Sequence, residues 1–243
     1  MPKFNAQHLL QQIHVSDDSE VLIEQVITQS QSKQGFTTLG FMNQHGVNLI
    51  AKDNALLKPF TDLDYILRDG IGMKLAFKFF KMPAGTNLNG TDFIPKLVNT
   101  VPENNTDFFV FGTQDPWLEK GSQKLLAGRQ FNTLDGFQAL SIYIDYLNEH
   151  IKAGSFNVII LAMGMPKQEE LAELIKQKVK QAGLVICGGA IIDFQAGRFP
   201  RAPQIFRTLS IEWLYRLLKE PRRLFKRYVI GIPVFFMNLV KFK

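Results

Sequence analysis

The sequence predicts an α/β fold: a Rossmann-like, mainly parallel sheet with helices on both faces, followed by a basic amphipathic helical appendage. Short β-branched or aromatic runs alternate with longer helical patterns, which is typical of βαβ units. The composition changes near 197–203, where we place the boundary between a body (residues 1–200) and an appendage (201–243). With 243 residues, 46% of them hydrophobic, the chain can bury one core of generous size.

Six strands are expected from short apolar runs, at 36–42, 65–67, 108–111, 131–134, 158–162 and 184–187. Helical periodicity fills the intervals, at 20–33, 72–80, 92–100, 116–126, 139–151 and 166–181. Four strands end in a turn that opens a helix, at 68–70, 112–114, 163–165 and 188–190. Because ligands of open α/β sheets bind at the carboxyl ends of the strands, we expect these turns to converge on one site.

The last 46 residues are strongly basic, with 11 Lys and Arg against two acids, Glu212 and Glu220. This segment therefore carries +9 while the whole chain carries +6, which leaves −3 for residues 1–197. Basic, aromatic and aliphatic side chains together suit an anionic, lipidic surface. The longest apolar stretch there, 228–240, is shorter than the roughly 20 residues that span a bilayer, so we expect it to lie in the interface.

Asp69 stands at the end of the second expected strand, before Gly70. A carboxylate there can face a cleft and act as a general base, or it can cap the following helix. The local sequence leaves both interpretations open. The run 69–75 lacks the third glycine of a dinucleotide-binding loop, and its acidic residue precedes that loop. An NAD(P)-dependent oxidoreductase is therefore disfavoured.

A second polar segment follows the fifth expected strand. Gly164 and Pro166 open a helix whose first turn holds Lys167, Gln168 and Glu169. Free backbone N–H groups at such a turn favour an anion, so these side chains are candidates for contact with a phosphate or a sugar. Proline at a helix start is also ordinary, which explains part of the motif without a ligand.

A third polar segment, at 87–92, contains Asn89, Thr91 and Asp92. Such side chains read sugar hydroxyls, because hydroxyls both donate and accept hydrogen bonds. Thr91 or Asp92 can instead cap the next helix. The remaining candidates follow the last expected strand: Gly188, Gly189, Asp193 and Arg198.

No metal site is expected. Asp62 and Asp64 have the spacing of a metal-binding DxD motif, but they precede their strand, and we interpret them as part of a solvated loop. The four histidines are scattered without zinc-ligand spacing. The single cysteine, Cys187, excludes an intramolecular disulfide and suits a reducing cytosol. The N-terminus lacks the apolar run of a signal peptide.

Taken in chain order, these motifs resemble one family. They are Asn43, Asp69-Gly70, GMPKQE at 164–169, GGA…DF…AGR at 188–198, RAP at 201–203 and EWLYRLLKEPRRLFKRY at 212–228. The order is similar to that of the WecG/TagA/CpsF family of bacterial glycosyltransferases, over residues 36–228. The segments at 164–169 and 212–228 are specific in combination.

The resemblance implies an inverting, metal-independent transfer, without a cofactor, from a UDP-sugar to a sugar linked to undecaprenyl diphosphate. It implies that Asp69 is the base and that Asn43 and Gln168 lie in the pocket. The appendage is implied to complete the active site of a catalytic body. It is also implied to meet an anionic membrane surface peripherally, at the cytoplasmic face of the bacterial inner membrane. The arginines expected at the diphosphate are Arg201, Arg216, Arg223 and Arg227.

Two departures from the family pattern bear on the donor sugar. Many members carry Thr-Pro-Asn where this chain has Phe41-Met42-Asn43, so the pocket contact of the threonine is absent. The loop NLNGTD at 87–92 resembles the exopolysaccharide branch exemplified by the xanthan glucosyltransferase. We therefore expect glucose to be transferred, in cell-surface or exopolysaccharide synthesis. The alternative is transfer of N-acetylmannosamine onto lipid-linked N-acetylglucosamine.

Two other functional classes would also account for some of these features. A non-catalytic, nucleotide-sensing module recruited to membranes would keep its biological role after Asp69 is replaced. A nucleic-acid binder would use the basic segment, but the Ile, Leu and Phe content of that segment suits lipid better than a phosphate backbone. We therefore expect no nucleic-acid partner.

Overall fold

The computed structural model describes residues 3–208 and 211–243 and contains one six-stranded parallel sheet, in the order β2-β1-β6-β5-β3-β4. The strands are β1 (Phe36–Met42), β2 (Tyr65–Arg68), β3 (Thr106–Gly112), β4 (Asn132–Leu134), β5 (Phe156–Ala162) and β6 (Gly183–Cys187). This confirms the predicted α/β class and all six predicted strands, with bounds that differ by at most two residues.

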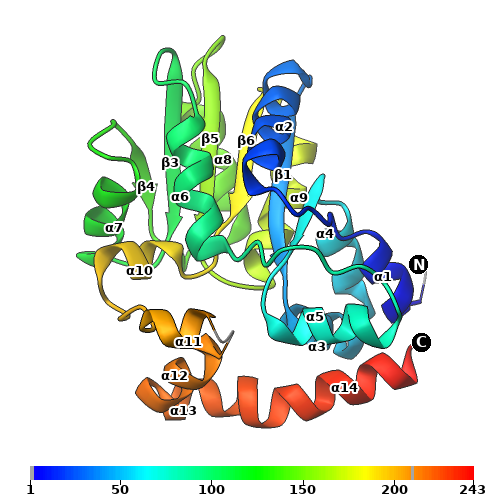
Figure 1. The fold of residues 1–243 in the computed structure, drawn as a ribbon. Helices are drawn as coiled ribbons and strands as arrows, with labels where there is room; N and C mark the ends of the chain where they lie inside the picture. Colours follow the sequence, from blue (N-terminus) through cyan, green and yellow to red (C-terminus); the bar gives the residue numbers. More distant parts are fainter. Residues whose placement is uncertain (1–2, 209–210) are drawn as a thin grey trace.

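Helices connect the strands and cover the sheet (Figure 1). Those of the body are α1 (Ala6–Gln11), α2 (Ser19–Ser32), α3 (Gln44–Lys52), the 3₁₀ turn η1 (Asn54–Leu56), α4 (Leu57–Thr61), α5 (Ile71–Phe79), α6 (Gly90–Thr100), α7 (Trp117–Leu125), α8 (Leu140–His150), α9 (Lys167–Lys178) and α10 (Ile191–Ala196). Three of them, α1, α3 and α4, were not expected from the sequence, and α10 was expected only from the turn at 188–190 that opens it. Helices α1 and α4 have six and five residues, which is too short for a clear helical period.

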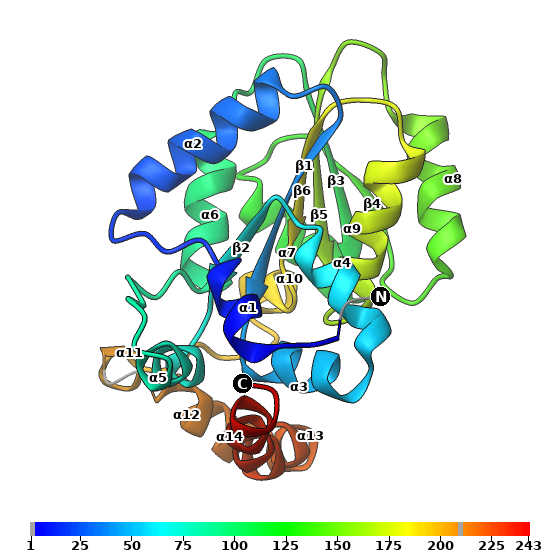
Figure 2. The same cartoon turned by 90° about the vertical axis from the view of Figure 1, so that its right-hand side faces the viewer.

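The core forms on both faces of the sheet, because alternate strand residues point to opposite sides. In β3, Phe109 and Phe111 pack with α8 and α9, whereas Phe108 and Val110 pack with α2 and α6. Figure 2 shows α2 and α6 on one side of the sheet and α8 and α9 on the other. The sheet is thus buried on both faces, as is usual for parallel strands.

The C-terminal segment forms the helices α11 (Gln204–Thr208), α12 (Glu212–Lys219) and α13 (Pro221–Phe225), the π-helical turn η2 (Lys226–Ile230) and α14 (Gly231–Lys241). These helices lie below the carboxyl ends of the strands, and α14 runs beneath α3 and α5 (Figure 1). Within the described residues, no helix has both the length and the apolar character needed to cross a membrane.

Helix α14 is anchored to the body by packing and by hydrogen bonds. Phe235 and Leu239 are buried in the core cluster that also contains Val47 of α3. The Asn48 side chain donates to the Gly231 carbonyl (2.7 Å) and accepts from the Asn238 amide (3.0 Å). Part of the C-terminal segment is therefore continuous with the core of the body.

Candidate active site

A cavity of about 530 Å³ lies at the carboxyl ends of the strands. All six strands contribute a lining residue from the turn that follows them: Asn43, Asp69, Thr113, Gly136, Gly164 and Gly188. The structure thus brings together the four turns that the sequence singled out. The opposite wall comes from the C-terminal helices, through Arg216, Arg223 and Arg227.

A second cavity, of about 290 Å³, lies next to the first. The two share five lining residues: Asn43, Asp69, Thr91, Arg216 and Arg227. The rest of the second lining is partly polar, with Asn87, Asn89, Asp92 and Glu212, and partly apolar, with Ile71, Leu75, Trp213, Ile232, Phe235 and Phe236. The residues common to both linings mark the junction between two cavities, each of which has a mixed polar and apolar lining.

Asp69 lies at this junction and is held by its backbone. Its N–H donates to the Met42 carbonyl (2.9 Å), and the following Gly70 N–H donates to the Asn87 side chain (2.8 Å). Helix α5 has Gly70, with a φ of 89°, as its N-cap and receives no side-chain cap in the described part of the chain. The capping interpretation of Asp69 is therefore wrong, and its carboxylate is available to the cavities.

The environment of Asp69 sets its proton affinity. Burial raises the pKa of the carboxyl above its ordinary value, while Arg227, the Asn43 amide, Arg216 and Arg68 oppose that rise. Asn43 also caps α3, since its side-chain oxygen accepts from the backbone N–H groups of residues 45 and 46. This cap fixes the Asn43 amide, which then donates to Asp69.

Gln168 is buried and lines the first cavity. Its side-chain oxygen accepts from the Gly189 N–H (2.9 Å), and its amide donates to Glu169 (2.8 Å), which ties the β5–α9 turn to the β6–α10 turn. Glu169 is fully buried behind Gln168 and lies outside both cavity linings. Burial raises the pKa of the Glu169 carboxyl to about 8.

Lys167 also lies outside both linings, although the sequence suggested it for ligand contact. Its ammonium donates to the carbonyls of Gly136 (2.8 Å) and Gln138 (2.6 Å) and lies 5.3 Å from the Tyr143 ring centroid. These bonds hold the β4–α8 loop, whose Gly136 and exposed Phe137 line the first cavity. Lys167 therefore shapes the cavity wall through this loop.

The polar loop at 87–92 serves the fold and also lines the second cavity, through Asn87, Asn89, Thr91 and Asp92. Asn89 caps α6 by accepting from the Asp92 N–H (3.1 Å). The sequence had suggested Thr91 or Asp92 for this cap, and that interpretation is wrong. The Asp92 carboxylate forms an ion pair with Arg201. Arg201, expected at the diphosphate, is thus paired with Asp92 and lines neither cavity. Thr91 lines both.

Asp193 and Arg198 line the first cavity together with Gly188, Gly189 and Thr113. The Arg198 guanidinium donates to the Asp193 carboxylate and to the Thr113 hydroxyl, at 3.0 Å in both cases. The Thr113 hydroxyl donates to the same carboxylate oxygen (2.9 Å). Sequence reasoning missed Thr113 as a site residue, although its place directly after β3 could have identified it.

Three arginines reach the cavities from the C-terminal helices. Arg216 and Arg227 line both cavities, and each has a buried Nε atom without a hydrogen-bond partner among the described residues. Arg223 lines the first cavity and donates to Glu220 (2.6 Å). A buried N–H donor without a partner is costly, so Arg216 and Arg227 are suited to an anionic ligand.

Two further ionisable residues were not anticipated. His45 lines the first cavity, and burial together with Arg227 lowers the pKa of its imidazole to about 4, which leaves the ring neutral at pH 7. Glu212 of α12 lines the second cavity, and burial raises the pKa of its carboxyl against the opposing effect of Arg201 and Arg216. Glu212 opens the motif at 212–228 and His45 lies two residues after Asn43, so proximity to these motifs could have identified both.

The DxD-like pair lies away from both cavities. Asp64 accepts from Lys33 (2.6 Å) and from the Thr38 N–H and hydroxyl (2.9 Å each), while Asp62 pairs with Lys58 (3.5 Å). Both carboxylates thus belong to ion pairs of the body. Within the described residues, no group of three His, Cys, Asp or Glu side chains is placed to hold a metal ion.

Comparison with known proteins identifies the relatives of this chain. The model of the glycosyl transferase WecG/TagA/CpsF family matches residues 8–243. Two proteins of Staphylococcus aureus, from strains MW2 and NCTC 8325 / PS 47, are 30% identical over 205 residues, which is 83% of this chain and 78% of theirs. Both are named N-acetylglucosaminyldiphosphoundecaprenol N-acetyl-beta-D-mannosaminyltransferase.

The expectation that glucose is transferred is wrong, because these relatives are named as transferases of N-acetylmannosamine. The expectation rested on the departure at Phe41-Met42 and on the polarity of the loop at 87–92. In the structure that polarity caps α6, holds Gly70 and pairs Arg201, so much of it has a structural task. The exopolysaccharide assignment relied on the same loop and has no other support.

Proposed function

The chain belongs to the WecG/TagA/CpsF family of glycosyl transferases, and we propose that it transfers N-acetylmannosamine from a UDP-linked donor to N-acetylglucosamine carried on undecaprenyl diphosphate. The observation that carries the proposal is the position of Asp69 at the junction of two cavities, facing Arg216 and Arg227. The first cavity, where the turns after all six strands meet three arginines, suits a nucleotide sugar. The second, which is lined by α5 and α14, suits a sugar attached to a lipid.

The reaction follows from this placement. The acceptor hydroxyl transfers its proton to the Asp69 carboxylate as its oxygen attacks the anomeric carbon of the donor. The bond from that carbon to the β-phosphate oxygen breaks, and the leaving nucleoside diphosphate keeps the electron pair. One displacement inverts the configuration. The raised pKa of Asp69 makes it a stronger base than an ordinary aspartate, which favours proton transfer.

The charge that develops on the leaving diphosphate needs positive partners. At the junction, the Nε atoms of Arg216 and Arg227 have no hydrogen-bond partner in the part of the chain that the structure describes, and Arg223 lines the first cavity. Charge-assisted hydrogen bonds from guanidinium groups are strong and match phosphate geometry. We therefore propose that these arginines act where other transferases use a divalent metal.

The C-terminal segment supports a peripheral location at the cytoplasmic face of the membrane. It combines a net charge of +9 over residues 198–243 with exposed apolar side chains, among them Ile205, Leu218 and Phe225. Such a surface is attracted to anionic lipids. Its arginines would then complete the site next to the lipid-linked acceptor.

The test is a donor panel with a lipid-linked N-acetylglucosamine acceptor, read by mass spectrometry of the lipid product. UDP-N-acetylmannosamine should add one N-acetylhexosamine mass, and UDP-N-acetylglucosamine and UDP-glucose should add little. Equal or better transfer from another donor, or no product from UDP-N-acetylmannosamine, would reject the proposed donor.

A further inference from the structure

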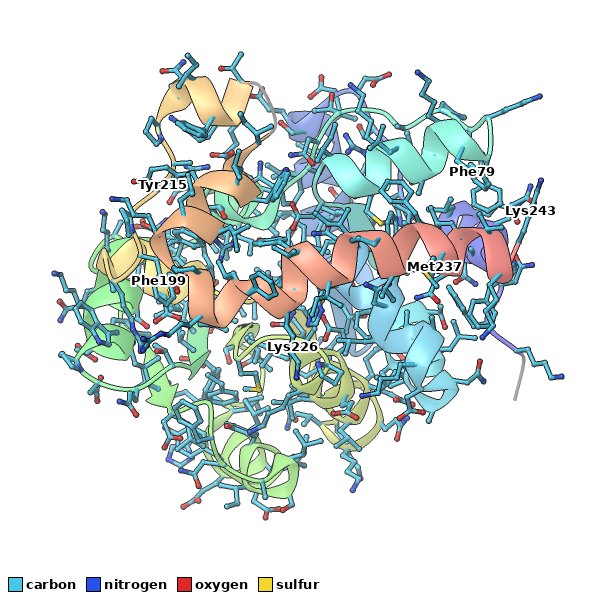
Figure 3. The ribbon with its side chains drawn as sticks, turned by 90° about the horizontal axis from the view of Figure 1, so that it is seen from below. Phe79, Phe199, Tyr215, Lys226, Met237 and Lys243 are labelled. Atoms are coloured by element: carbon cyan, nitrogen blue, oxygen red, sulfur yellow. The ribbon has the colours of Figure 1, made fainter. Side chains whose placement is uncertain are left out.

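Helices α5 and α14 lie side by side on the underside of the molecule, although one belongs to the body and the other to the C-terminal segment. Each buries one face in the same core cluster, through Phe77 of α5 and Phe235 of α14. Figure 3 shows Phe79 near Lys243, and the Lys243 ammonium lies 5.9 Å from the Phe79 ring centroid. The two helices thus present their outer faces together.

Those outer faces carry exposed apolar side chains that no other element of the described chain covers. On α5, Leu75 is 42% exposed and Phe79 is 47% exposed. On α14, Met237 is 68% exposed and Val240 is 66% exposed. A helix that is apolar on both its inner and its outer face normally has a second apolar environment beside it. Exposed apolar side chains gathered on two neighbouring helices favour an interaction site.

The charged side chains of these two helices are all positive. Neither α5 nor α14 contains an acidic residue. Lys74 and Lys78 are exposed on α5, and Lys241 and Lys243 are exposed at the end of α14. Apolar side chains surrounded by lysines fit the boundary between acyl chains and anionic headgroups, because the lysines can reach the phosphates while the apolar groups enter the bilayer.

The second cavity lies between the same two helices. It is lined by Ile71 and Leu75 of α5 and by Ile232, Phe235 and Phe236 of α14, and it extends to Asp69. Leu75 and Phe236 are both more than one third exposed, so the cavity reaches the outer surface where the two helices meet. A ligand in the bilayer can therefore approach Asp69 between α5 and α14.

We infer that α5 and α14 together form one docking surface for an anionic bilayer, with the acceptor cavity opening between them. The body then shares membrane contact with the C-terminal segment. The polyprenyl chain of the acceptor passes between the two helices while its sugar reaches Asp69. This inference rests on the proposed function for the identity of the acceptor, but bilayer docking itself needs no sugar substrate.

The test compares vesicle binding of Phe79→Glu and Met237→Glu, one on each helix, with two matched controls. Val21→Glu on α2 and Ile142→Glu on α8 change side chains that are 49% and 43% exposed on other faces. The vesicles contain phosphatidylglycerol and phosphatidylcholine. We expect each of the first two changes to weaken binding about tenfold, since a buried apolar side chain of this size contributes more than the ~1.4 kcal/mol that a factor of ten represents. The controls should bind like the unchanged protein.

Binding of Phe79→Glu at the level of the unchanged protein would overturn the inference, because it would leave α5 outside the membrane surface. Phe79→Gln, which adds no charge, should also weaken vesicle binding. If this variant binds like the unchanged protein, the weaker binding of Phe79→Glu comes from charge repulsion alone, and the inference is rejected. Melting temperatures of all variants verify folding. Vesicle binding is measured without substrate, so a failure of the proposed transfer reaction would not affect this result.

Discussion

Several residues at the candidate site have both a structural and a chemical task. Asn43 caps α3 through its side-chain oxygen and donates to Asp69 through its amide. Gln168 joins two turns and still lines the first cavity. Side chains that are fixed in this way lose little entropy when a ligand binds, which is the advantage of a preorganised site.

Glu169 provides a prediction about pH and stability. Its pKa is about 8 in the native state and roughly 4.3 in an unfolded chain, so between these values the native state holds a proton that the unfolded chain has lost. The free energy of unfolding therefore falls as the pH rises through this window. Glu169→Gln is neutral throughout and should melt higher than the unchanged protein at pH 8, with a smaller difference near pH 5.

Thermal melts at both pH values measure this effect. Glu170→Gln, on the same helix, controls for the removal of a carboxylate from α9. A melting-temperature difference for Glu169→Gln that is the same at both pH values would show that the buried carboxyl does not titrate differently in the two states.

The sequence identified many site residues but not their tasks. Residues that follow a strand, such as Asp69 and Gly188, could be found because strand ends converge in a parallel sheet. Lys167 occupies the right motif, yet it bonds to a loop 30 residues away, and only the three-dimensional structure determines that contact. Glu212 and His45 gain their environment from elements that are distant in sequence.

At the scale of elements, the C-terminal helices deliver the arginines to the site. Arg216 lies on α12, Arg223 on α13 and Arg227 in the π-helical turn η2, so successive turns point to one region. π-helical turns occur often at functional sites. The family resemblance pointed to these three arginines together with Arg201. Only the tertiary packing separates Arg201, which pairs with Asp92, from the three that reach the cavity.

This arrangement predicts transfer without a divalent metal. The guanidinium groups of Arg216, Arg223 and Arg227 supply the positive charge that the leaving diphosphate requires. Turnover measured in EDTA should remain near its untreated value. A loss of turnover that Mg²⁺ or Mn²⁺ restores would show that these arginines are insufficient.

At the scale of the whole molecule, charge is separated between the two parts of the chain. Residues 1–197 carry −3 and residues 198–243 carry +9, yet α14 is packed into the core of the body. The basic segment is thus fixed to one side of the molecule. In the proposed function, this side faces the membrane and both substrates meet at Asp69.

The measurement that tests this account most directly is the turnover of Asp69→Asn with UDP-N-acetylmannosamine and the lipid-linked acceptor, together with UDP affinity and melting temperature. The amide keeps the shape of the side chain but cannot accept the proton. We expect kcat to fall by roughly 10²–10⁴-fold, the usual contribution of a general base, while UDP affinity and melting temperature remain nearly unchanged. Turnover close to that of the unchanged protein would contradict the account and remove Asp69 from the reaction.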